Sequence, residues 1–92
     1  MSKRKEAPAE VRAAFARRVL NARIKKGWNQ SELARQAALH MPDGRFGRDS
    51  ISKYEKATHL PYPVQLDALA KALGIPPAEL LPQNPGIGES MD

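Results

Sequence analysis

Two stretches of the chain carry polar side chains whose spacing suits the binding of a nucleic acid. Within residues 27–34, Asn29 can cap the start of a helix, and Glu32, three residues later, can reach back to it. Gln30 then lies on the first helical turn, where backbone N–H groups point outward at an anion such as phosphate. A second predicted helix has an outer side that can reach base edges or phosphates, formed by Arg48, Asp49, Ser50, Ser52 and Lys53.

Charge is distributed unevenly along the 92 residues. Residues 1–35 hold ten of the fifteen Lys and Arg residues and three acidic residues, whereas residues 57–92 hold one base and four acids. A net charge of +5 with this asymmetry favours a face turned toward a polyanion, although a merely solvated surface would look the same.

Composition argues against several other classes of protein. The chain has no cysteine, which excludes disulfides and thiolate chemistry, and its two histidines have no matching metal-ligand spacing. We therefore expect no metal and no cofactor. The basic start is not followed by an apolar stretch, so we expect neither a secretory signal nor a membrane span, and a cytoplasmic protein of a prokaryotic cell is the default. No catalytic set of residues is recognisable, and we expect no enzyme.

Hydrophobic periodicity predicts five short helices and no strand. The first carries a stripe of Val11, Phe15 and Val19, with Leu20 and Ile24 as a second pair, and ends at Gly27. The second runs from Asn29 to about Ala38. Residues 40–47 then read as a loop, because they contain proline and two glycines. Further helices are predicted over residues 48–56, around the stripe of residues 66–73, and after the prolines at 76 and 77.

Three segments in this order resemble the phage repressor and Cro family of helix-turn-helix proteins. They are residues 27–34, residues 51–55 and residues 66–75 followed by Leu80 and Leu81. The resemblance covers roughly residues 12–81 and implies an all-α, five-helix domain. We therefore expect a flexible basic arm over residues 1–10, a helix-turn-helix DNA-binding domain over residues 11–81 and a disordered tail over residues 82–92.

The resemblance also implies roles for single residues. Gln30 matches a glutamine that clamps a phosphate and braces the recognition helix. Arg48, Asp49, Ser50 and Lys53 match positions that read bases. Arg23 and Glu55 match a partly buried salt bridge between the first and third helices. The loop that usually follows the DNA backbone would contain Lys56, Thr58 and His59.

Two features depart from the family pattern. The segment between Ala34 and Ile51 is about seven residues longer than the usual short turn, so either the second helix runs on or the turn bulges. Within it, Arg45 is a candidate phosphate contact. Ala57 stands where the family often has glycine, and the left-handed conformation common there is costly for other residues, so we expect this turn to differ.

Several side chains allow more than one interpretation. Trp28 can stack on a base, but we expect it to seal the core. Phe46 can pack on the domain, touch a thymine methyl or contact a partner, and packing is our first choice. Leu39 and Met41 are expected to be buried. Asp49 can accept from cytosine, hold Arg48 in place or only cap its helix.

We interpret the chain as a sequence-specific regulator of transcription that binds double-stranded DNA, most simply a repressor that acts as a homodimer on a two-fold operator. The alternative is a protein-interaction regulator with the same fold, such as the antitoxin of a toxin–antitoxin pair or an anti-activator. The inserted loop and the free tails favour that alternative, which requires a protein partner.

Overall fold

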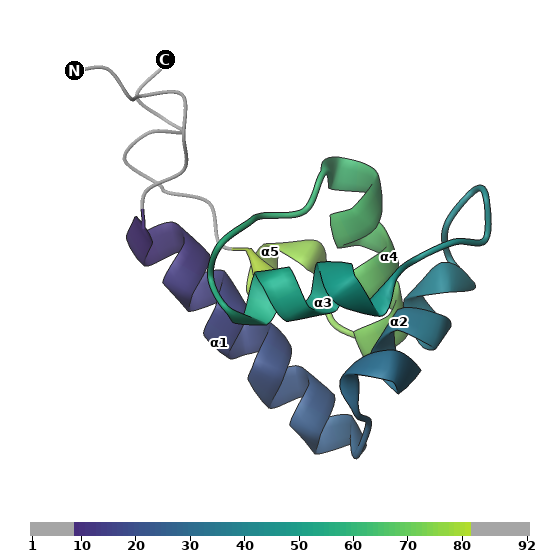
Figure 1. Cartoon of the computed structure of the whole chain (residues 1–92), viewed down its shortest axis with the longest axis horizontal. Coiled ribbons are helices and arrows are strands. Elements are labelled where there is room, and N and C mark those ends of the chain that lie inside the picture. The colour runs from purple at the N-terminus through teal and green to yellow at the C-terminus, as the bar shows by residue number, and fades with distance from the viewer. Residues whose placement is uncertain (1–8, 82–92) are drawn as a thin grey trace.

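The computed structural model describes residues 9–81, which form an all-helical domain (Figure 1). Its helices are α1 (Ala9–Lys26), α2 (Gln30–Ala38), α3 (Arg48–Glu55), α4 (Pro63–Leu73) and α5 (Pro77–Leu80). The expected N-terminal arm and C-terminal tail lie outside the described residues, except that residues 9 and 10 belong to α1. Each helix within residues 9–81 is too short or too polar to span a bilayer.

A single core holds the five helices together. It contains Phe15 and Val19 of α1, and side chains from each of the other helices pack against them: Leu33, Ala37, Ile51, Tyr54, Leu69, Leu73 and Leu80. The predicted stripe of α4 is therefore confirmed at Leu69 and Leu73. Ile24, expected to form a second inward pair with Leu20, is instead 61% exposed, because the 3.6-residue repeat places it on the opposite side of α1 from Phe15.

Tyr54 links the core to the start of α4. Its ring is buried against Phe15 in an edge-to-face contact with centroids 5.7 Å apart. Its hydroxyl donates to Oε1 of Gln65 at 2.9 Å. Burial of the phenol raises the pKa of Tyr54, so the side chain is neutral and can donate this hydrogen bond at physiological pH.

The long segment between α2 and α3 is a bulging loop. α2 ends at Ala38, so the helix does not run on. Met41 and Phe46 pack against the core, as expected, and the Phe46 ring lies edge-on to Tyr54 at 6.5 Å. The prediction that Leu39 is buried is wrong: its side chain is 73% exposed, because it caps the end of α2 where the chain turns away from the core.

The turn after α3 keeps the left-handed conformation at Ala57, where φ is +63°. The expectation that the missing glycine changes this turn is therefore wrong. Hydrogen bonds on both sides hold it in place: the Ala57 N–H donates to the Tyr54 carbonyl at 3.1 Å, and Arg12 Nε donates to the Ala57 carbonyl at 3.0 Å. These contacts offset the steric cost of a Cβ at positive φ.

Candidate nucleic-acid interface

The start of α2 is fixed by a side-chain cap. Asn29 is the N-cap, and its Oδ1 accepts from the Glu32 N–H at 2.8 Å. The Glu32 side chain was expected to reach back to Asn29, and it does not form that bond. Its carboxylate instead accepts from Arg35 at 2.6 Å and from Gln36 at 2.7 Å, because both donors lie within one turn of the same helix.

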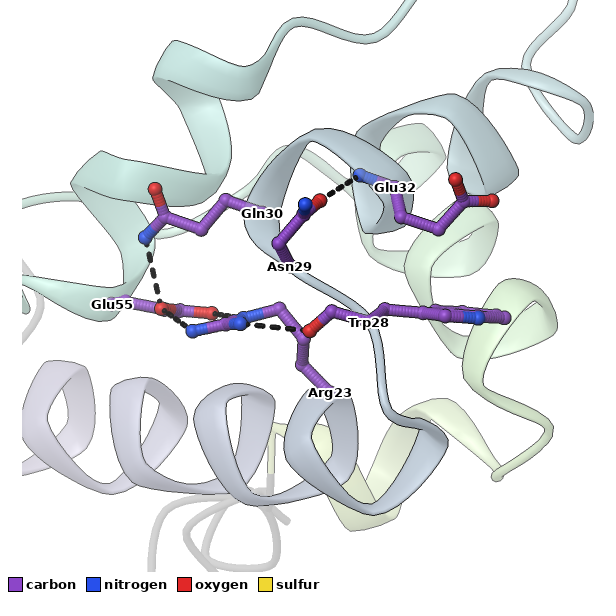
Figure 2. Close-up of polar contacts among 6 residues, drawn as sticks. All are labelled: Arg23, Trp28, Asn29, Gln30, Glu32 and Glu55. Atoms are coloured by element: carbon purple, nitrogen blue, oxygen red, sulfur yellow. Dashed lines mark hydrogen bonds and ion pairs between the residues drawn. The ribbon is translucent and has the colours of Figure 1, made fainter.

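Glu55, at the end of α3, accepts hydrogen bonds from two other helices (Figure 2). Arg23 of α1 donates through Nε to Oε2 at 2.7 Å and through Nη2 to Oε1 at 3.0 Å. Gln30 of α2 donates through Nε2 to Oε1 at 3.0 Å. Arg23 Nη1 also donates to the Trp28 carbonyl at 2.9 Å, which ties the link between α1 and α2 into the same network.

This network is largely shielded from water. The exposed fraction of the side chain is 15% for Arg23 and 8% for Glu55. The hydrogen bond to Glu55 raises the pKa of Arg23, so the guanidinium stays charged at any ordinary pH. A forked pair of bonds fixes direction as well as distance, so the network sets how α3 lies against α1 and α2.

Beside the network lies an open hollow of about 390 Å³ between the start of α2 and the start of α3. Its lining consists of Arg23, Asn29, Gln30, Ser31 and Arg48. The side chain of Arg48, several uncharged polar groups and the N-terminus of a nine-residue helix therefore surround it, together with Arg23, whose charge is paired with Glu55. Such a lining suits a phosphate group, because helix N-terminal N–H groups and guanidinium groups are both common donors to phosphate oxygens.

α3 turns one face to solvent. Ile51 and Tyr54 are buried, and Arg48, Asp49, Lys53 and Lys56 are exposed on the opposite side. Ser50 and Ser52 are partly exposed. The structure thus brings the candidate base-reading residues onto one helical surface that adjoins the hollow.

Asp49 is not the helix cap. The N-cap of α3 is Gly47, and Asp49 occupies the first turn, where its negative charge is favourable near the helix N-terminus. Two of the predicted roles of Asp49 remain: it can accept a hydrogen bond from cytosine N4, or it can hold Arg48 in place.

The turn after α3 contains Thr58 and His59, two residues that were predicted to contact the DNA backbone. Thr58 Oγ1 donates to the carbonyl of Lys53 at 3.0 Å and lies 2.9 Å from Nδ1 of His59. Thr58 and His59 are both exposed beyond the end of α3.

Arg45 lies apart from the other candidates, in the inserted loop. Its backbone N–H donates to Oδ1 of Asp43 at 3.1 Å, and its side chain is exposed. The side chain does not line the hollow. Phe46, next to it, anchors the loop on Tyr54 and so fixes where Arg45 leaves the domain.

Sequence reasoning missed Ser31, which is exposed and lines the hollow with Gln30. Its position two residues after the N-cap, in the first turn of α2, could have revealed it, since the first-turn residues of a helix surround the same anion site. Trp28 is partly buried against the core, as expected, and Nζ of Lys26 lies 5.4 Å from the centroid of its ring.

Known proteins share this architecture. A family model described as a helix-turn-helix domain matches residues 16–86. One solved structure, of a hypothetical transcription factor named NHTF from Neisseria, is similar with a TM-score of 0.67 and 25% sequence identity. The similarity covers 100% of this chain and 98% of that chain. No curated protein matches the chain.

The matching model spans most of the sequence, from α1 through α5, and includes the network and the hollow described above. The family model describes helix-turn-helix domains in general. The narrower resemblance to phage repressors stays a prediction from the sequence. On the evidence of the family match and the fold together, the chain belongs to the helix-turn-helix domain family.

Proposed function

We propose that this protein is a sequence-specific regulator of transcription that binds double-stranded DNA, and that it represses by occupying a two-fold operator as a homodimer. α3 enters the major groove, and the start of α2 contacts the flanking phosphate. The protein would then act in the cytoplasm, on the nucleoid when bound.

The observation that carries this proposal is the shared position of Gln30. Its side chain lines the hollow that suits a phosphate and also donates to Glu55 at the end of α3. A phosphate held at the start of α2 is thereby linked, through one side chain, to the helix that presents Arg48 and Lys53. Phosphate contacts of this kind set the register in which a recognition helix meets the bases.

The comparisons support the same direction. Helix-turn-helix domains place the second helix of the motif, which corresponds to α3 here, in the major groove. The similar Neisseria protein is described as a hypothetical transcription factor. The exposed side of α3 mixes arginine, serine and aspartate, and these are residue types that distinguish base pairs.

Arg48→Ala and Lys53→Ala are expected to affect DNA binding differently. The test duplex is one selected from a random-sequence library with the wild-type protein. Arg48 begins α3 and can form a forked contact with guanine, so its loss is expected to cost about 1–3 kcal/mol on the selected duplex and to relax specificity at one position. Lys53, as a phosphate contact, is expected to weaken binding to every duplex alike.

The control for these two variants is Lys71→Ala. Lys71 is an exposed lysine on α4 that pairs with Asp67 at 3.1 Å, and its loss is expected to leave DNA binding unchanged. Fluorescence anisotropy on the selected duplex and on a scrambled one measures all three variants. If the Arg48 and Lys53 variants bind both duplexes like the wild type, α3 is not the reading element.

The inserted loop is expected to contribute to binding rather than to folding. Shortening residues 39–47 to a turn of ordinary length should leave a folded domain by circular dichroism and weaken binding to the selected duplex, because it removes Arg45 and the anchor at Phe46. If instead DNA affinity is unchanged and a protein partner is lost in pull-downs, the exposed Leu39 marks a protein contact and the alternative function gains support. An unfolded variant would show that the packing of Met41 and Phe46 against the core is required for folding.

A further inference from the structure

The turn between α3 and α4, residues 57–62, is held separately at its two ends. At the end next to α3, the N–H and the Oγ1 of Thr58 both donate to the Lys53 carbonyl, at 3.1 Å and 3.0 Å. At the end next to α4, the N–H of Tyr62 donates to Oε1 of Gln65 at 3.1 Å. The far end of the turn therefore follows the side chain of a residue in α4.

One buried hydroxyl joins that far end back to α3. Tyr54 of α3 donates from its hydroxyl to the same Oε1 of Gln65, at 2.9 Å. The Tyr54 ring is 4% exposed and lies edge-on to Phe15 and to Phe46, so its hydroxyl projects from a fixed place. A single oxygen of Gln65 thus connects the recognition helix with the last residue of the turn that follows it.

The turn carries groups that suit a DNA phosphate. The side chains of Lys56, at the C-cap of α3, and of His59 are exposed. The N–H groups of His59 and Leu60 have no backbone acceptor within residues 9–81. Basic side chains and backbone N–H groups are common donors to phosphate oxygens. The place of the turn therefore decides whether these donors meet the backbone of a duplex.

We propose that the Tyr54 hydroxyl positions this turn for contact with the DNA backbone, acting through Gln65. The inference rests on the proposed DNA-binding function, and it adds a buried positioning residue to the exposed residues that touch the duplex. In this arrangement α3 is oriented against α1 and α2 through Glu55, and it orients the neighbouring backbone contacts through Tyr54.

The first test is Tyr54→Phe, which removes the hydroxyl and keeps the ring that packs on Phe15 and Phe46. We expect a folded protein that binds the selected duplex and a scrambled one about 3- to 10-fold more weakly, because a backbone contact that carries no sequence information is impaired. The slope of log affinity against log salt should become shallower by about 0.9 for each phosphate that loses its partner.

The controls separate this role from stability, since a buried phenol needs an acceptor in any case. Val19→Ala removes buried methyl groups of α1 and lowers stability without touching the link. It should keep the wild-type affinity and salt slope at a temperature where all variants are folded. Gln65→Leu removes the acceptor and should weaken binding at least as much as Tyr54→Phe. Adding Tyr54→Phe to it should weaken binding no further, because the bond is already broken.

Ethylation interference on the selected duplex identifies the phosphates concerned. The phosphates at which Lys56→Ala loses interference are those that the turn contacts, and Gln30→Ala marks those at the start of α2 in the same way. We expect Tyr54→Phe to lose interference at the phosphates marked by Lys56 and to keep it at those marked by Gln30.

Three results for a folded Tyr54→Phe variant would overturn the inference while DNA binding stands. These are wild-type affinity with a wild-type salt slope, interference lost at the phosphates marked by Gln30, and a loss of affinity confined to the selected duplex. If this variant does not fold, the same measurements on Gln65→Leu decide, and a second unfolded variant would assign the bond to folding and overturn the inference. A wild type that selects no duplex at all would remove the proposed function, and the inference with it.

Discussion

Replacing Glu55 with alanine is expected to lower the free energy of unfolding by about 3–5 kcal/mol, because it leaves the charged Arg23 guanidinium in a site that water hardly reaches. Domains of this size have about 5–15 kcal/mol in total, so the loss is a large part of the stability. The same change removes the acceptor of Gln30 and breaks the hydrogen bonds that join the end of α3 to α1 and α2. Urea unfolding followed by circular dichroism measures the effect.

A double-mutant cycle separates the pair from its surroundings. Arg23→Met combined with Glu55→Leu removes both charges and is expected to cost less than the sum of the two single changes. The matched control is Asp67→Ala, which breaks the exposed pair with Lys71 on α4 and is expected to cost less than about 1 kcal/mol. Additive losses at Arg23 and Glu55 would mean that the two side chains do not depend on each other.

Glu55→Gln tests whether the network matters for DNA as well as for stability. Glutamine keeps the shape of the side chain and one acceptor oxygen, but it lacks the negative charge that holds Arg23 through two bonds. We expect a folded protein with weaker binding to the selected duplex, since the orientation of α3 against α2 is less firmly set. A folded variant that binds like the wild type would restrict Glu55 to a structural role.

Much of the fold could be predicted from local sequence signals. Asn29 and Gly27 mark a helix boundary through their own chemistry, and the stripes of Leu33, Ile51 and Leu69 face inward because the helical repeat places them on one side. These signals depend on a few neighbouring residues, so they could be read without the rest of the molecule.

Other features depend on contacts between distant segments. The left-handed Ala57 is held in part by Arg12, forty-five positions earlier in the chain, and no local pattern indicates that bond. The exposure of Leu39 depends on the path of the loop after α2, which the packing of Phe46 on Tyr54 determines. The side chain of Glu32 had competing partners within its own helix, and the sequence alone did not show which of them it would take.

Part of the candidate site could be predicted from the sequence, because a family resemblance assigns residues by their position in the motif. The resemblance supplied Arg23, Glu55 and Gln30 by position, and the structure brings these three side chains together. The hollow beside them depends on the angle between α2 and α3, which the inserted loop made impossible to assume. Ser31 could have been proposed from its place in the first turn of α2, but the hollow that it lines could not.

DNA binding is expected to depend steeply on salt. Arg45, Arg48, Lys53 and Lys56 are all exposed in one copy, and a pair of copies presents twice that number to a duplex. If about four to eight phosphates are neutralised per pair, the logarithm of affinity should fall against the logarithm of salt concentration with a slope of roughly −4 to −7. Between 50 and 200 mM salt, affinity should then drop by about 250-fold to 16,000-fold.

The most direct measurement of the central claim is therefore a salt titration of wild-type binding to the selected duplex and to a scrambled duplex of equal length. Because both duplexes carry the same phosphates, the proposed interface predicts steep slopes for both. It also predicts tighter binding to the selected duplex throughout, since base contacts of α3 add to the backbone contacts. A flat response to salt, or equal affinity for the two duplexes at every concentration, would contradict sequence-specific DNA binding through α2 and α3.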